Sequence, residues 1–173
     1  MSKTVRETGA DLEALIDASI ASRDTRNIDW DTLKFQTKVG DEYRRAQVRY
    51  IGSGATGDHD GDDSILAAQN FTFSNMVLPP GCLGPEHTHH DVEEVFFVLE
   101  GQVEFSVHDV ADGSRKASRV LGYRDLIRVP AGVPRSLRTV SEEDALICVI
   151  IGAKKPQLPT YPKSSPMHGV TRD

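Results

Sequence analysis

The sequence contains little of what secreted or membrane-spanning proteins need. It has only two cysteines, too few for a disulfide framework in a chain of 173 residues. Its longest apolar run, residues 146–151, is far too short to span a bilayer. Acidic residues interrupt the N-terminal segment, which argues against a cleaved secretory signal. These absences predict a cytoplasmic protein.

Basic charge is also scarce, and it is scattered along the chain. There are 20 lysines and arginines against 26 acidic residues, giving a net charge of −6. The sequence shows no clustered basic patch of the kind that binds nucleic acid, and an acidic surface has no electrostatic reason to bind an anionic membrane. We therefore expect neither of these partners. Hydrophobic residues make up 38% of the chain, as in an ordinary single globular domain.

The first 64 residues form a pattern of their own. An apolar stripe at helical spacing predicts a short amphipathic helix over residues 9–22. Residues 43–51 alternate as a strand does, and residues 52–63 hold four aspartates and His59 among glycines. The glycine is misplaced for an EF-hand, so this segment indicates an exposed acidic turn. We interpret residues 1–64 as an N-terminal arm that packs on the rest.

From residue 65 onward, the chain is a series of short apolar segments separated by glycine and proline turns. This pattern predicts an all-β fold, either a sandwich or a barrel, over residues 65–152. Residues 153–173 hold four of the nine prolines and predict an extended tail that either wraps the barrel or stays mobile. The expected strands are residues 67–70 together with 71–78, then 94–99, 102–109, 117–121, 126–129, 135–140 and 145–151.

Three of the six histidines lie within four residues, and two of them are spaced so that both imidazoles can point at one spot. In an extended segment, His87 and His89 project to the same side, and a carboxylate beyond a bend, Glu94, can provide a third ligand. Two imidazoles with one carboxylate suit Fe(II), Mn, Ni, Co or Zn and leave positions open for water, substrate or dioxygen. His90 has the opposite parity and is expected to point outward, and Glu93 is expected to be a surface acid.

The spacing Gly81-x5-His87-x-His89-x4-Glu94-x6-Gly101 resembles the first motif of the cupin superfamily. A second segment, from Arg124 to Arg135, is similar to the second cupin motif in its Asp, Pro and Gly positions. The resemblance implies a double-stranded β-helix (jelly-roll barrel), here with a short N-terminal helix. It also implies a divalent metal held by His87, His89 and Glu94, and a two-fold homodimer.

The sequence departs from the second motif at Arg135, where a cupin usually has its fourth metal ligand, a histidine. Arginine has no lone pair to offer a metal. By strand parity, Arg135 is expected to point inward, where a buried guanidinium needs a partner. One possibility is that Arg135 binds an anionic group of a substrate beside a three-ligand metal. The other is an ion pair with Glu94 that replaces the metal site.

The leading functional hypothesis is a metal-dependent enzyme that acts on a small, anionic organic molecule. Resemblance to oxygen-using cupins implies a dioxygenase-like oxidoreductase with Fe(II), in which Arg135 takes part in catalysis; Zn, Ni and Mn remain possible metals. One alternative is a cupin that binds a small ligand without turnover. Another is a metal-dependent isomerase or lyase, for which no second carboxylate or tyrosine stands out as the base.

Overall fold

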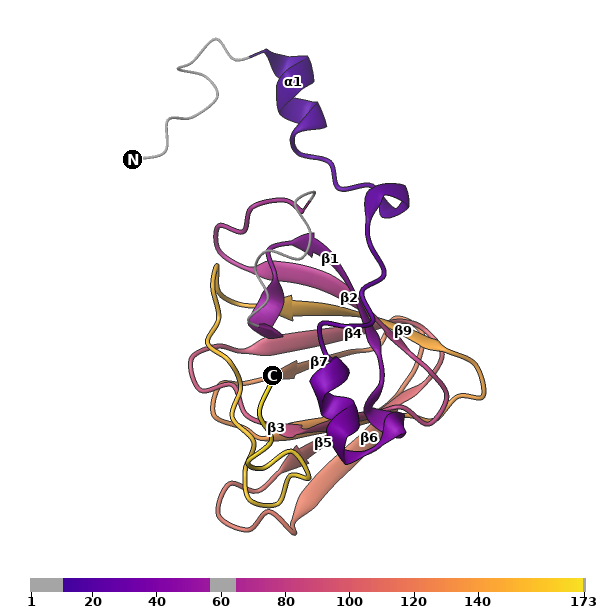
Figure 1. Cartoon of the computed structure of the whole chain (residues 1–173), viewed down its shortest axis with the longest axis vertical. Helices are drawn as coiled ribbons and strands as arrows, with labels where there is room; N and C mark the ends of the chain where they lie inside the picture. Colours follow the sequence, from indigo (N-terminus) through magenta and orange to yellow (C-terminus); the bar gives the residue numbers. More distant parts are fainter. Residues whose placement is uncertain (1–10, 57–64, 173) are drawn as a thin grey trace.

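The computed structural model describes residues 11–56 and 65–172, and in this part the chain folds into two antiparallel sheets that face each other (Figure 1). One sheet has the strand order β1-β2-β9-β4-β7, and the other has the order β3-β8-β5-β6. The strands are β1 (Ala46–Ile51), β2 (Thr72–Leu78), β3 (Leu83–His87), β4 (Glu94–Glu100), β5 (Val103–His108), β6 (Lys116–Leu121), β7 (Leu126–Val129), β8 (Arg135–Thr139) and β9 (Ala145–Ile151).

The hydrophobic core lies between the two sheets. Along β4, Phe96 and Val98 are buried in alternation with more exposed neighbours, as period-two patterning requires. Phe96 reaches Phe105 of β5 in the opposite sheet, with ring centroids 5.0 Å apart. The tightly turned glycine Gly101 joins these two strands at φ +73°. A side chain there would be strained and would collide with Ala145. The predicted all-β, jelly-roll fold is confirmed.

The N-terminal helix is shorter than predicted. Helix α1 covers only Leu12–Asp17, with Asp11 accepting hydrogen bonds from the amides of Glu13 and Ala14 as its cap. Its apolar side chains are exposed, Leu12 to 68%, and Figure 1 shows α1 standing away from the two sheets. Four short 3₁₀ helices follow in this half of the chain: η2 (Arg23–Thr25), η3 (Lys34–Val39), η4 (Asp41–Tyr43) and η5 (Gly54–Thr56).

Two strands differ from the prediction in ways that matter for the site. Strand β1, predicted to lie in the arm, pairs with β2 and is part of the barrel's larger sheet. Strand β3 was not among the predicted strands, because its Gly84 and Pro85 are typical of a turn. The predicted strand at residues 67–70 is wrong. Most of the predicted acidic loop, including His59, lies outside the described residues.

The proline-rich C-terminal segment runs along the barrel (Figure 1). Thr88 and Thr160 exchange backbone hydrogen bonds of 2.9 and 3.0 Å, which attach the segment to the end of β3. Met167 is completely buried against Leu33 and Phe35 of the N-terminal half. Of the two outcomes expected for this tail, the structure shows the one in which it wraps the barrel. None of the helices in the described part of the chain is long and apolar enough to cross a membrane.

Candidate metal centre and cavity

Strands β3, β4 and β8 bring the sequence-predicted site residues together. His87 ends β3 and lies directly opposite Arg135, the first residue of β8. Glu94 begins β4 on the inward face, in phase with the buried Phe96. His89 lies in the connection between β3 and β4, where its carbonyl accepts a hydrogen bond of 2.7 Å from the amide of Gly132.

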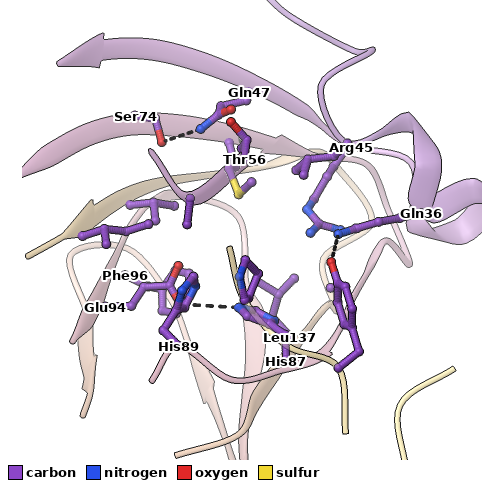
Figure 2. Close-up of a pocket in the computed structure, with 18 of the residues that line it drawn as sticks. Gln36, Arg45, Gln47, Thr56, Ser74, His87, His89, Glu94, Phe96 and Leu137 are labelled. Atoms are coloured by element: carbon purple, nitrogen blue, oxygen red, sulfur yellow. Dashed lines mark hydrogen bonds and ion pairs between the residues drawn. The ribbon is translucent and has the colours of Figure 1, made fainter. Parts of the chain in front are cut away.

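The three predicted metal ligands converge on one point (Figure 2). The Nε2 atoms of His87 and His89 lie 3.6 and 3.7 Å from the same Glu94 oxygen, Oε2. One potential ligand atom from each residue lies within 4.8 Å of the other two. His89 and Glu94 are buried and His87 is half-buried, so the donors face the interior of the barrel.

The protonation states suit metal binding. His87 Nδ1 lies 2.8 Å from the Pro85 carbonyl oxygen, which can only accept, so a neutral His87 keeps its lone pair on Nε2. Burial lowers the pKa of His89 to about 4, an effect that the charge of Glu94 only partly offsets. Burial alone would raise the pKa of Glu94, but His87, His89 and Arg135 outweigh it and hold that pKa below its ordinary value. Near pH 7, His89 is therefore neutral and Glu94 is ionised.

The donor set fits a divalent metal, with one opposing charge. The buried Glu94 Oε2 and His89 Nδ1 have no hydrogen-bond partner among the described residues. Buried polar atoms of this kind call for a ligand or ion. Arg135, only 2% exposed, places Nε 3.5 Å from Glu94 Oε2 and donates from Nη2 to the Pro130 carbonyl. The inward orientation predicted for Arg135 is confirmed. His87, His89 and Glu94 can hold a metal, and Arg135 would weaken its binding.

A cavity of about 70 Å³ adjoins the two histidines and Glu94. Arg135 is not among the residues that line it, whereas a second buried arginine, Arg45, is. The C-terminal segment contributes Tyr161 and Arg172 to the lining. The other lining residues are Leu33, Gln36, Gln47, Ala55, Thr56, Ser74, Met76, Gly84, Phe96, Leu137, Val149, Ile151 and Pro159.

The sequence alone does not point to Arg45 or to the tail residues of the cavity. Arg45 and Gln47 share a face of the predicted strand 43–51, and polar residues at alternate positions normally indicate a solvent-facing side. Here that side faces the cavity. The tail residues of the lining, from Pro159 onward, lie 70 or more positions beyond the histidines, and no local pattern predicts where an extended segment docks.

Other polar residues near the motif are where the sequence placed them. His90 is exposed and lies 2.7 Å from the Thr160 hydroxyl, away from the donor set. Glu93 is exposed and forms an ion pair of 2.9 Å with Arg128. These two residues therefore serve as matched controls for their neighbours His89 and Glu94.

Two facing antiparallel sheets that enclose the core are the architecture of a double-stranded β-helix, or jelly roll. Residues 74–151 match the family model described as "Cupin domain". The match covers a little less than half of the chain, and it confirms the resemblance of the motifs in this segment to that superfamily. The chain has no significant match among curated protein sequences.

Solved structures with the same fold have different activities. An oxalate oxidase structure matches with a TM-score of 0.58 and 18% identity, over 92% of this chain and 68% of the other. Peruvianin-I, described as a cysteine peptidase from Thevetia peruviana latex, matches with a TM-score of 0.59 and 16% identity, over 81% and 75%. CapF with a tropolone inhibitor matches with a TM-score of 0.51 and 15% identity, over 64% of this chain and 28% of the other. At these identities the likeness is one of fold, and the reaction has to be argued from the site.

Proposed function

We propose that this chain is a metal-dependent cupin enzyme that acts on a small, anionic organic molecule. The observation that carries this proposal is the convergence of His87 Nε2, His89 Nε2 and a Glu94 oxygen beside a cavity. Three protein ligands leave coordination positions open, which is typical of catalytic rather than structural metal sites.

The donor chemistry favours Fe(II) and an oxygen-dependent oxidoreductase of the dioxygenase type. Two imidazoles and one carboxylate are the ligand set of many non-haem iron oxygenases, although zinc, nickel or manganese would also fit. When bound, the metal would supply open positions for a chelating substrate and dioxygen. The chain's own residues hold the ligand atoms in place: Pro85 orients the ring of His87, and apolar side chains such as Phe96 and Leu137 line the cavity beside them.

Arg135 was predicted to bind an anionic group of the substrate, and this stays a prediction. Its guanidinium contacts Glu94 and lies outside the set of residues that line the cavity. We therefore propose that Arg135 acts on Glu94, orienting its carboxylate and reducing the charge of the donor set.

Metal content per chain tests the proposal. Elemental analysis of untagged protein is expected to show a near-stoichiometric divalent metal that is lost in His87→Ala and kept in the control His90→Ala. Iron together with dioxygen uptake would support the oxidoreductase; zinc, nickel or manganese with anaerobic turnover would support an isomerase or lyase instead. A protein that refuses all four metals on reconstitution contradicts the proposal.

One observation favours a second candidate, a cupin that binds a small ligand without turnover. The Arg135–Glu94 contact of 3.5 Å provides the carboxylate with a cationic partner from the protein itself. If this pair replaces the metal, the cavity still binds a ligand but has no Lewis acid. Metal-free protein with retained ligand binding is the result that would select this candidate.

Two further expectations belong to the proposal. A two-fold homodimer follows from the resemblance to small cupins, and light scattering of the full chain tests it. A cytoplasmic location follows from the sequence, and cell fractionation tests it. Both cysteines, Cys82 and Cys148, are buried and unpaired.

A further inference from the structure

Arg45 is a buried cation without a carboxylate partner. It lies just before β1, is 6% exposed, and its side chain lines the cavity beside the two histidines (Figure 2). Its Nη1 donates to the carbonyl oxygens of Leu83 at 3.2 Å and Tyr43 at 3.5 Å. Nε has no hydrogen-bond partner, and no acidic oxygen of the described residues lies within 4.0 Å of the guanidinium.

Two other buried arginines show what Arg45 lacks. Arg49, on β1, lies 3.3 Å from an Asp29 oxygen, and Arg135 lies 3.5 Å from a Glu94 oxygen. Each of these charges is therefore compensated by the protein itself. A guanidinium without a direct carboxylate contact is costly to bury, and Glu94 acts on Arg45 through its charge without touching it. A guanidinium that faces a cavity in this way can pair with an anion there.

The remaining lining supports an anion at this end of the cavity. Arg172, from the C-terminal segment, adds a second positive charge, while Glu94 is the only acidic residue in the lining formed by described residues. The cavity is thus more positive than the chain as a whole, whose net charge is −6. The amide of Gln36 donates to the Tyr161 hydroxyl at 3.3 Å, but its carbonyl oxygen has no partner among the described residues.

We propose that Arg45 is a carboxylate-binding residue and that the ligand is a small hydroxy- or oxo-carboxylic acid. The carboxylate pairs with the Arg45 guanidinium, and the second polar group of the ligand faces His87, His89 and Glu94. The cavity, of about 70 Å³, favours a small ligand over a large one. This inference rests on the proposed function for the second contact, whereas the Arg45 contact requires no metal.

The test compares carboxylates with their neutral amides by titration calorimetry. Glycolate and pyruvate, beside glycolamide and pyruvamide, are titrated into the full-length protein, both stripped of metal by a chelator and loaded with Mn²⁺. At least one carboxylate is expected to bind at least tenfold more tightly than its amide. Arg45→Met should remove this preference, and Arg45→Lys should keep part of it, because an ammonium retains the charge but not the bidentate geometry.

The matched control is Arg44→Met. Arg44 is the exposed neighbour of Arg45 and packs against the Trp30 ring, so its loss should leave the preference unchanged. The same titrations of Arg135→Met decide which arginine binds the anion. The inference is overturned if wild-type protein does not prefer any carboxylate over its amide. It is also overturned if Arg45→Met, shown to be folded by its circular dichroism spectrum, keeps the preference for the carboxylate. Loss of that preference in Arg135→Met alone would overturn it as well.

Failure of the proposed function would give a different result. A protein that binds no metal but shows the Arg45-dependent preference in its metal-stripped form contradicts the enzyme and supports the carboxylate site. A protein that binds metal at His87, His89 and Glu94 without this preference contradicts the carboxylate site alone.

Discussion

Arg135 sets the electrostatic balance of the donor set. One Glu94 oxygen lies 3.5 Å from the Arg135 Nε and 3.6 and 3.7 Å from the Nε2 atoms of the two histidines. A divalent cation at this point is attracted by Glu94 and repelled by the guanidinium. At a partly buried site, charges this close interact by several kcal/mol at an effective dielectric constant of about 20. The affinity for metal therefore depends on Arg135 although it cannot be a ligand.

Arg135→His is expected to raise the affinity for Mn²⁺ or Co²⁺ by at least about tenfold, because it removes a positive charge and adds a donor opposite His87. Arg135→Gln removes the charge without adding an imidazole, and it should give a smaller gain. Titration calorimetry with the purified variants measures both. A lower affinity in Arg135→His than in wild type would show that the guanidinium is needed to hold Glu94 in place.

Arg124 is held in an unfavourable backbone conformation. In the turn between β6 and β7 its φ is +68°, and it is the only non-glycine residue with a positive φ in the described part of the chain. A left-handed conformation costs a residue with a Cβ roughly 1–2 kcal/mol. Glycine avoids this cost, which gives a physical reason for the glycine that the second cupin motif usually has here.

Arg124→Gly is expected to raise the free energy of unfolding by up to about 1 kcal/mol, since part of the relief is lost to the greater freedom of glycine in the unfolded chain. Arg124→Ala keeps the Cβ and should bring no such gain. Urea denaturation of the two variants and wild type provides the comparison. Equal stabilisation by both substitutions would mean that the arginine side chain, and not the backbone, is unfavourable.

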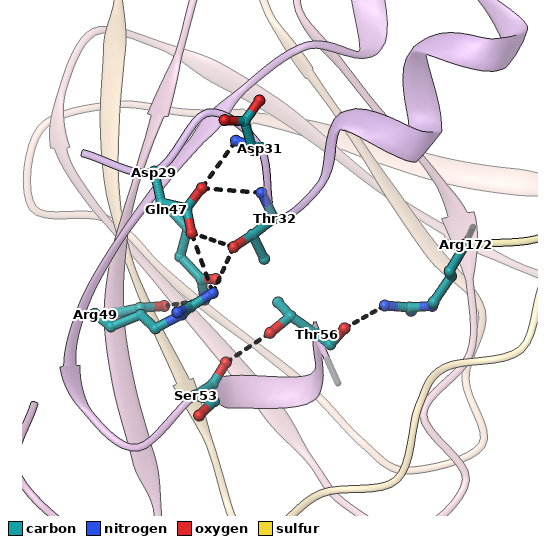
Figure 3. Close-up of polar contacts among 9 residues, drawn as sticks. Asp29, Asp31, Thr32, Gln47, Arg49, Ser53, Thr56 and Arg172 are labelled. Carbon is teal, nitrogen blue, oxygen red and sulfur yellow. Dashed lines mark hydrogen bonds and ion pairs between the residues drawn. The ribbon is translucent and has the colours of Figure 1, made fainter. Parts of the chain in front are cut away.

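At the scale of elements, the C-terminal segment connects the cavity to the N-terminal half. It is attached by the hydrogen bonds between Thr88 and Thr160, by the buried Met167, and by Arg172, which donates to the Thr56 carbonyl at 2.6 Å (Figure 3) and stacks over Phe35. Because Tyr161 and Arg172 line the cavity, loosening this segment would open it to solvent. Access to the site and docking of the tail are therefore coupled.

Met167→Ala is expected to weaken this docking by about 2 kcal/mol or more, the cost of truncating a buried methionine. Hydrogen exchange at the amides of Thr88 and Thr160 should become faster, because both are bonded across the tail contact. Leu158→Ala, at an exposed position of the same segment, should leave the exchange unchanged. Identical exchange in Met167→Ala and wild type would show that other contacts hold the tail.

At the scale of the molecule, the sequence predicts well those features that depend on residues close together in the chain. The barrel strands alternate with period two, and His87, His89 and Glu94 come from two consecutive strands, β3 and β4, and the short connection between them. Arg45 meets them only because β1 joins the larger sheet, and Tyr161 only because the tail crosses the cavity. Contacts of such long sequence separation carry no periodic signal, so the cavity could not be assembled from the sequence.

The connection of the N-terminal half to the barrel should make the stability of the whole molecule depend on pH. Asp29 accepts hydrogen bonds from the amides of Asp31 and Thr32, at 2.8 and 2.9 Å, and from the Thr32 hydroxyl, and it pairs with Arg49 of β1 (Figure 3). Burial by itself would raise the pKa of Asp29, but these hydrogen bonds and the charge of Arg49 hold it below its ordinary value of 3.8.

A carboxyl whose pKa is lower in the folded state stabilises that state above the unfolded pKa. The contribution of Asp29 is therefore complete near pH 7, and it is lost as the pH falls below 3.8 through the folded pKa. Asp29→Asn should lower the free energy of unfolding by about 1.5–3 kcal/mol at pH 7, the value of hydrogen bonds to a charged group. The difference from wild type should shrink as the pH approaches 3. Asp31→Asn, whose side chain is 80% exposed, should show neither effect in chemical denaturation across this range. If the loss in free energy of unfolding caused by Asp29→Asn is the same at pH 3 and pH 7, the charge of the Asp29 carboxylate does not stabilise the contact with Arg49 of β1.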